Sequence, residues 1–217
     1  MPGGGKMELQ KALARSPRAD LISEVTQMIS GLLLVFFLWT HMIFVAVIWL
    51  GSSTFNMLAH FMETYELLPA TVVFLILVFG LHVGAVIRRV PRQWDEQRII
   101  WKHAKLIHHS DTWSWLFQVI TGAAILALAI VHIAVVTYGG ISVKYSSLRV
   151  HNGFLIFYAV LLVLAEYHAS VGLYRIFVKW GWVKRSSLKR VLGVLSLLTI
   201  AIGAITLGIF YALGAQA

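Results

Sequence analysis

The stretch LLPATVVFLILVFGLHVGAVI, residues 67–87, decides the fold class, because none of its residues is Asp, Glu, Lys or Arg. A helix needs about 20 predominantly apolar residues to cross a bilayer. Four further stretches have a similar character, at 29–50, 113–138, 150–178 and 191–213. All five are longer than the roughly 9–11 residues of a transmembrane strand. The sequence therefore predicts an all-α integral membrane bundle of five transmembrane helices, forming one domain over residues 1–217.

The composition of the 217 residues supports this assignment. Apolar side chains make up 59% and charged side chains 12%, whereas soluble domains carry about 25% charged residues. The net charge of +9 does not indicate nucleic-acid binding, because the basic residues lie between spans and not on a soluble module. The chain has no cysteine, which excludes disulfides, cysteine-ligated metal centres and covalently attached haem in this chain. We find no convincing internal repeat.

The basic residues are distributed unevenly along the chain. Sixteen of the eighteen lie in the N-terminal arm, between the second and third spans, or around the connection between the fourth and fifth. Only Lys144 and Arg149 fall on the opposite side. Because cytoplasmic connections carry the excess of Lys and Arg, we expect a cytoplasmic N-terminus and an external C-terminus. The inner connection at 88–112 contains Trp94 and Trp101, and fits either an interfacial segment or a docking surface for a soluble partner.

Four histidines lie inside the spans, one on each of the first four: His41, His82, His132 and His168. A single histidine of this kind is explained by a hydrogen bond to a neighbouring helix, but strongly polar groups in four successive spans indicate a function. Their distances from the cytoplasmic ends place His82 and His168 in an inner layer, and His41 and His132 in an outer layer. At about 1.5 Å rise per residue, the two layers are roughly 10–18 Å apart.

Paired histidines on facing helices suit a flat metal macrocycle that is bound from both faces. Neutral imidazole is a good ligand for iron, so the pattern predicts two bis-histidine b haems. Small residues near the inner histidines would allow the close approach that a porphyrin needs, although such residues also pack membrane helices together. They are Gly80, Gly84, Ala165, Ala169 and Gly172. The alternative is a haem-free ion or proton transporter, which would lack b-type visible bands.

Three acidic residues lie on or near the spans. Glu166 is inside the fourth span, where a charged side chain costs on the order of 2.5–3.5 kcal/mol on insertion scales. We expect it to transfer protons; a hydrogen bond to a neighbouring helix or to a haem propionate is the alternative. Glu63 and Glu66 lie in the outer connection between the first two spans. Either could accept a proton from a quinol, and either could be an ordinary solvated carboxylate.

Three segments are distinctive: EYHASVGLYRIFVKWGW at 166–182, HSDTWSWLFQVITG at 109–122 and THMIFV at 40–45. They resemble the fourth helix, the start of the third and the centre of the first in the dihaem cytochrome b membrane-anchor subunit of quinol:fumarate reductases, within the succinate:quinone oxidoreductase superfamily. The resemblance spans nearly the whole chain and preserves all four in-span histidines. It argues against the cytochrome b anchor of a hydrogenase, formate dehydrogenase or nitrate reductase.

The resemblance implies a function for the chain as a whole. It implies a subunit that anchors a flavoprotein and an iron–sulfur subunit at the cytoplasmic side of the inner membrane, in a complex that could be a dimer. The chain would oxidise menaquinol and pass electrons through two b haems, whereas fumarate would be reduced on another subunit. The first four helices would hold the haems, with His82 and His168 at the proximal haem and His41 and His132 at the distal one.

The resemblance also implies roles for individual residues. Glu63 matches the family's menaquinol-site glutamate, and Glu166 matches the glutamate of its proposed transmembrane proton path. The positions that resemble its haem-propionate contacts are Arg149, Lys179 and Trp115. The outer loop between the third and fourth helices differs from the family, so Lys144 and His151 stay unassigned, as does Glu66.

Overall fold

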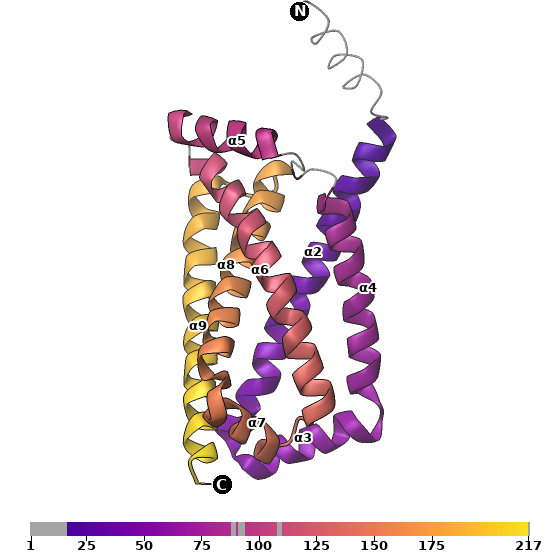
Figure 1. Ribbon diagram of the computed structural model, residues 1–217, viewed down its shortest axis with the longest axis vertical. Coiled ribbons are helices and arrows are strands. Elements are labelled where there is room, and N and C mark those ends of the chain that lie inside the picture. Colours follow the sequence, from indigo (N-terminus) through magenta and orange to yellow (C-terminus); the bar gives the residue numbers. More distant parts are fainter. Residues whose placement is uncertain (1–16, 88–89, 91–93, 108–109, 217) are drawn as a thin grey trace, which may run out of the picture.

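A computed structural model describes residues 17–87, 90, 94–107 and 110–216 of the chain. Over these ranges the chain is helical and contains no strand, which confirms the predicted all-α class. Five long helices run along the length of the molecule (Figure 1): α2 (Pro17–Ala46), α4 (Leu67–Ile87), α6 (Ser110–Gly139), α8 (Leu155–Lys179) and α9 (Arg185–Gly214). By length and composition, each belongs to a segment that is able to cross a membrane, so five predicted spans correspond to five observed ones.

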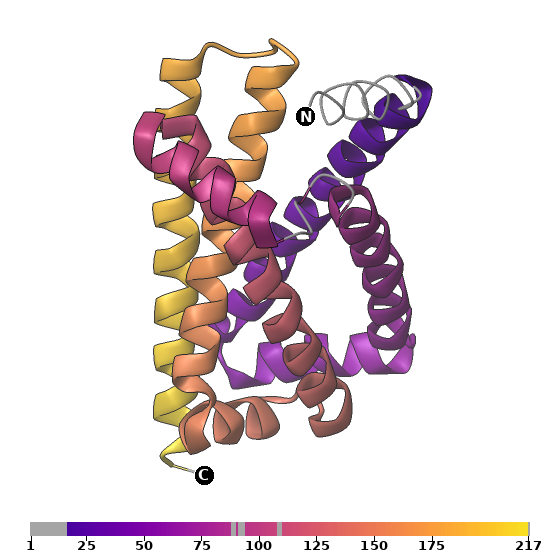
Figure 2. The same cartoon turned by 45° about the horizontal axis from the view of Figure 1, so that its top comes forward.

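Shorter helices lie across the two ends of the bundle. Helix α5 (Trp94–Ile107) lies across the end of the bundle at which α8 finishes and α9 begins (Figures 1 and 2). Helices α3 (Ser52–Thr64) and α7 (Val143–Arg149) lie at the other end, where α9 finishes. The described basic residues on α5 and around the turn between α8 and α9 therefore lie at one end of the molecule.

The outer connection between the first two spans forms a helix that is tied to the bundle. A 3₁₀ turn (Val47–Leu50) follows α2, and Gly51 then takes a φ of 107°, a conformation that glycine adopts without strain. In α3, Phe55 and Ala59 are 3% and 2% exposed, and the side-chain carbonyl of Asn56 accepts a hydrogen bond from the Val143 N–H at 2.9 Å. Helix α3 is thus a fixed part of this end of the molecule.

The helix ends differ from the predicted spans where polar residues continue a helix beyond the apolar run. Helices α2 and α9 begin well before residues 29 and 191, because backbone hydrogen bonding does not stop where side chains become charged. The predicted span 150–178 is interrupted near its start. A π turn (Val150–Phe154) with a φ of 125° at Gly153 separates α7 from α8. Helix α4 has the predicted bounds of 67–87.

Helix α9 packs along α8 and reaches α7 at its C-terminal end. The last residue of α9, Gly214, contacts α7 so closely that a Cβ there would lie 2.6 Å from the Cβ of His151 and would overlap the backbone carbonyl of Ser147. Backbone atoms of a packed helix do not move aside as a flexible side-chain end does. This close approach therefore depends on glycine.

We predict that Gly214→Ala lowers the free energy of unfolding by about 1–3 kcal/mol, the usual effect of overpacking. Gly208→Ala in the same helix is the matched control, because a Cβ at Gly208 would meet nothing within 4 Å. That control should be neutral or should stabilise by up to about 1 kcal/mol, since alanine is the better helix former. Thermal denaturation of the two variants in detergent measures the difference, and equal stability would contradict the assigned contact.

Candidate functional site

A cavity of about 1170 Å³ lies between α2, α4, α6 and α8, with a smaller contribution from α9. It extends from Glu24 and Lys179 near the α5 end to Ile141 and Ser146 near the α7 end. Its lining is mainly apolar, and its volume exceeds the roughly 300–1,000 Å³ of most small-molecule pockets. All four in-span histidines line it, one from each of the four long helices. The predicted site residues His41, His82, His132 and His168 thus converge on one space.

The inner pair consists of His82 on α4 and His168 on α8, and both residues line the cavity. Each ring is held by a hydroxyl from the adjacent helix. Ser30 Oγ of α2 lies 3.1 Å from His82 Nδ1, and Thr121 Oγ1 of α6 lies 3.2 Å from His168 Nδ1. Both hydroxyl contacts are made with Nδ1, and neither involves the second nitrogen of the ring, Nε2.

The outer pair consists of His41 on α2 and His132 on α6. Their ring centroids are 5.9 Å apart with an interplanar angle of 67°. The His41 ring stacks on Phe37, and the His132 ring meets Tyr158 edge-on at 5.4 Å. His132 Nδ1 is buried and has no hydrogen-bond partner in the part of the chain that the structure describes. The outer histidines thus meet ring to ring, whereas the inner histidines share matching hydroxyl contacts.

A site that offers only two histidines suits a metal whose other ligands do not come from the protein. Within the described ranges, His, Cys, Asp and Glu nowhere gather in a group of three or more that could hold a metal ion. A pair of neutral imidazoles is sufficient for a metal whose remaining positions are filled by a macrocycle, as in haem. The donor set and the size of the cavity both fit that group.

The glycines that contact the inner histidines differ from Gly80 and Gly84, which the sequence predicts. A Cβ at Gly80 or Gly84 would meet no described atom within 4 Å. A Cβ at Gly31 of α2 would instead lie 3.3 Å from His82 Cε1, and one at Gly122 of α6 would lie 2.9 Å from His168 Cε1. The residues that leave room for the imidazoles lie on the neighbouring helices, because a ring projects away from its own backbone.

Positive charge lines the cavity near both ends. Lys179 Nζ pairs with Glu24 Oε1 at 2.7 Å near the α5 end. Arg149 donates from its guanidinium to the Gly140 carbonyl at 2.7 Å near the α7 end. Trp115 of α6 also lines the cavity, so all three residues predicted to contact haem propionates border the same space.

Glu166 is 1% exposed and lies outside the cavity lining, on a different face of α8 from His168. Ser170 Oγ donates a hydrogen bond to Glu166 Oε1 at 3.1 Å, and the Ser170 hydroxyl also hydrogen-bonds Ser196 Oγ of α9. The second carboxyl oxygen, Oε2, is buried and has no hydrogen-bond partner among the described residues. The expected separation of the acid from the histidine is confirmed, and hydroxyls of two helices surround the acid.

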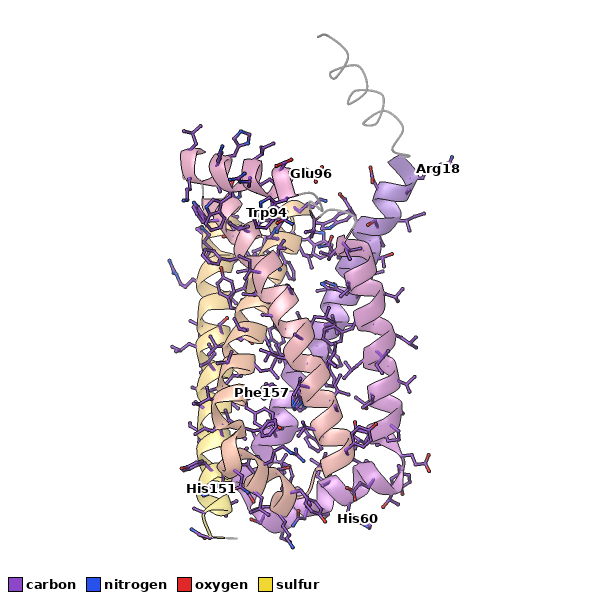
Figure 3. All side chains as sticks on the ribbon, in the orientation of Figure 1. Arg18, His60, Trp94, Glu96, His151 and Phe157 are labelled. Atoms are coloured by element: carbon purple, nitrogen blue, oxygen red, sulfur yellow. The ribbon has the colours of Figure 1, made fainter. Side chains whose placement is uncertain are left out.

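The remaining candidate residues lie at the α3 and α7 end of the molecule. Glu63 and Glu66 are exposed and do not belong to the cavity lining, although Met62, next to Glu63, does. Lys144 is exposed on α7. His151 stacks against Tyr211 of α9 with centroids 4.8 Å apart, and Figure 3 shows it near the C-terminal end of the bundle.

Sequence reasoning missed the hydroxyls that hold the inner histidines, although the sequence contains a signal for them. Residues 27–31 read QMISG and residues 118–122 read QVITG. The two segments share the pattern Gln-x-Ile-Ser/Thr-Gly, and each faces one inner histidine.

Comparisons with known proteins all identify the same family of membrane subunits. A sequence profile described as "Succinate dehydrogenase/Fumarate reductase transmembrane subunit" matches residues 94–207. The chain is similar to proteins named "Fumarate reductase cytochrome b subunit" from two strains of Helicobacter pylori, at 32% and 31% identity over 204 residues. These matches cover 88% of this chain and 80% of each relative. A protein of the same name from Wolinella succinogenes is 32% identical over 214 residues, covering 88% of this chain and 81% of the relative.

Proposed function

The chain belongs to the family of succinate dehydrogenase/fumarate reductase transmembrane subunits, and from this membership we propose that it is the dihaem cytochrome b anchor of a menaquinol:fumarate reductase. The observation that carries the proposal is the arrangement of the histidines: two pairs, at two depths, in one cavity between the same four helices. We propose that these helices and α9 form a single transmembrane domain.

The residues of the cavity would hold two b haems. His82 and His168 are the proposed axial ligands of the inner haem, and His41 and His132 those of the outer one. Lys179 and Trp115 would face the propionates of one haem, and Arg149 those of the other. When bound, the haems supply one-electron carriers between menaquinol and the iron–sulfur and flavin groups of the partner subunits.

The partner subunits would dock at the α5 end of the molecule, which we assign to the cytoplasmic side. The sequence places sixteen of the eighteen basic residues on this side. Helix α5 exposes Trp94, at 73%, to the surroundings (Figure 3), and Lys105 Nζ lies over the Trp101 ring at 5.5 Å. Aromatic and basic side chains of this kind suit a surface between head groups and a soluble protein.

Purification of the affinity-tagged chain from its native membranes tests the proposal. We expect a flavoprotein and an iron–sulfur protein to copurify in mild detergent, with two b haems per copy of the chain and low-spin visible bands. The assay for the complex is fumarate reduction by a menaquinol analogue. A preparation without haem, or without these two partners, would overturn the assignment.

Glu166 is proposed to carry protons across the inner half of the membrane during menaquinol oxidation. Moving one charge against a membrane potential costs about 2.3 kcal/mol per 100 mV, and a proton that accompanies each electron cancels that charge movement. The Ser170 and Ser196 hydroxyls supply the first hydrogen-bonding groups next to the carboxyl. Its position off the histidine face separates this path from the haem ligands.

We predict that Glu166→Gln slows quinol-linked fumarate reduction by roughly 10²-fold, which is typical for loss of a proton-transferring side chain. The substitution keeps the shape of the side chain and removes its titrating proton, so the haem content should be unchanged. Fumarate reduction by a reduced viologen is the internal control, because that donor bypasses this subunit. Normal quinol-linked turnover in sealed liposomes, without a membrane potential, would show that Glu166 is only a structural hydrogen-bonding residue.

A further inference from the structure

The two inner histidines have the same surroundings, built twice from different helices. On α2, Ser30 is 3% exposed and its Oγ lies 3.1 Å from His82 Nδ1. On α6, Thr121 is 7% exposed and its Oγ1 lies 3.2 Å from His168 Nδ1. The next residue along each helix is the glycine that leaves room for the ring. A contact that recurs with a different hydroxyl residue on a different helix indicates a requirement for the hydroxyl group itself.

The direction of these hydrogen bonds follows from the backbone contacts of the hydroxyls. Ser30 Oγ lies 2.6 Å from the Thr26 carbonyl, and Thr121 Oγ1 lies 2.7 Å from the Phe117 carbonyl. A carbonyl only accepts, so each hydroxyl donates its single hydrogen to the carbonyl four residues earlier. The oxygen then has only lone pairs to offer the imidazole, so we infer the tautomer in which the histidine donates from Nδ1.

A histidine that donates from Nδ1 has its proton on that nitrogen and a free lone pair on Nε2. Nε2 is then the atom that binds a metal. A hydrogen bond from the distal N–H of a ligating histidine also fixes the ring orientation and strengthens the imidazole as an electron donor. The outer layer differs, because His132 Nδ1 finds no such partner among the described residues.

We propose that Ser30 and Thr121 are positioning residues for the inner haem, which orient His82 and His168 and strengthen them as ligands by accepting their Nδ1 protons. The proposal rests on the assignment of this chain as a haem-binding subunit and extends it to two residues that touch neither haem nor quinol. A stronger imidazole donor stabilises ferric relative to ferrous iron. With the haem bound, the two hydroxyls would hold its reduction potential below the value that the same histidines would give alone.

The test uses the purified complex with all of its subunits and compares paired variants. Thr121→Val and Ser30→Ala remove the acceptor oxygen, whereas Thr121→Ser and Ser30→Thr keep it. Thr199→Val is the matched control, because Thr199 Oγ1 donates to the Leu195 carbonyl in the same way but lies on α9, away from the histidines. The measurements are the midpoint potential of each haem in a redox titration and the highest g-value of each ferric haem in low-temperature electron paramagnetic resonance.

We expect Thr121→Val and Ser30→Ala to raise the potential of the inner haem and to shift its g-value, with the outer haem unchanged. Thr121→Ser, Ser30→Thr and Thr199→Val should match the wild type. Loss of the inner haem in Thr121→Val with retention in Thr121→Ser would also support the role of the hydroxyl.

Two results would overturn the inference: wild-type potentials and g-values in Thr121→Val, or equal changes, including equal haem loss, in Thr121→Val and Thr121→Ser. Failure of the proposed function would give a different result. The wild-type complex itself would then lack the inner haem, and the inference about Ser30 and Thr121 would be wrong for that reason.

Discussion

His168→Ala is expected to remove the inner haem from redox-resolved spectra while the outer haem keeps its low-spin bands. The substitution deletes one of the two axial ligands, and its partner His82 lies on a different helix and cannot supply both. The outer pair lies on α2 and α6, with ring contacts to Phe37 and Tyr158 that do not involve His168. The reciprocal variant, His132→Ala, should remove the outer haem alone.

The matched control for these variants is His60→Ala. His60 is exposed on α3, outside the cavity lining, and Figure 3 shows it at the α3 end of the molecule. Its ring contacts the Thr64 hydroxyl one turn further along the same helix. Haem content and both potentials should therefore match the wild type. Retention of two fully occupied low-spin haems in His168→Ala would show that the ligand assignment is wrong.

Glu63→Gln is expected to reduce quinol-linked fumarate reduction by about 10²–10⁴-fold, the range for loss of a general base. Glu63 lies near the C-terminal end of α3 and is exposed, and its neighbour Met62 lines the cavity, so we expect a quinol bound at the α3 end of the bundle to meet its carboxylate. Glutamine keeps the length of the side chain but cannot take the proton that quinol oxidation releases.

Glu66→Gln is the matched control for Glu63→Gln. Glu66 is also exposed, but it stands in the turn after α3 with a φ of 51°, on a different part of the backbone. It should retain near wild-type quinol-linked activity. Activity with a reduced viologen should be equal in both variants, because that electron donor bypasses the quinol site. The reverse ranking would move the quinol role to Glu66, and unchanged activity in both would remove it from α3.

The sequence was sufficient for those parts of the fold that depend on apolar run length and helix rise. Helix α4 has the predicted bounds because polar residues border its apolar run closely. The pairing of His82 with His168 and of His41 with His132 follows from depth alone, since a helix converts residue number into distance along the membrane normal. These features need no knowledge of how the helices are rotated.

The features that were not predicted depend on the rotation of each helix about its axis and on tertiary contacts. The contacts of Ser30 and Thr121 with the histidines require two helices to present particular faces to each other, which run length does not encode. Helix α3 was predicted only as a connection, because its stability comes from the burial of Phe55 and Ala59 against other elements. The cavity lining likewise separates Glu63 from Met62, although they are adjacent in sequence.

The hydrogen bond between Ser170 of α8 and Ser196 of α9 bears on the order in which the protein is assembled. Because α8 is synthesised before α9, the Glu166 carboxyl first has the hydroxyl of Ser170, one turn away on its own helix, and lacks the hydroxyl of Ser196 behind it. An unsatisfied polar group in hydrocarbon costs several kcal/mol. Helix α9 contains no histidine, yet it adds a second hydroxyl, that of Ser196, next to the Ser170 hydroxyl. We therefore expect the insertion of α9 to stabilise the four helices that enter the membrane before it.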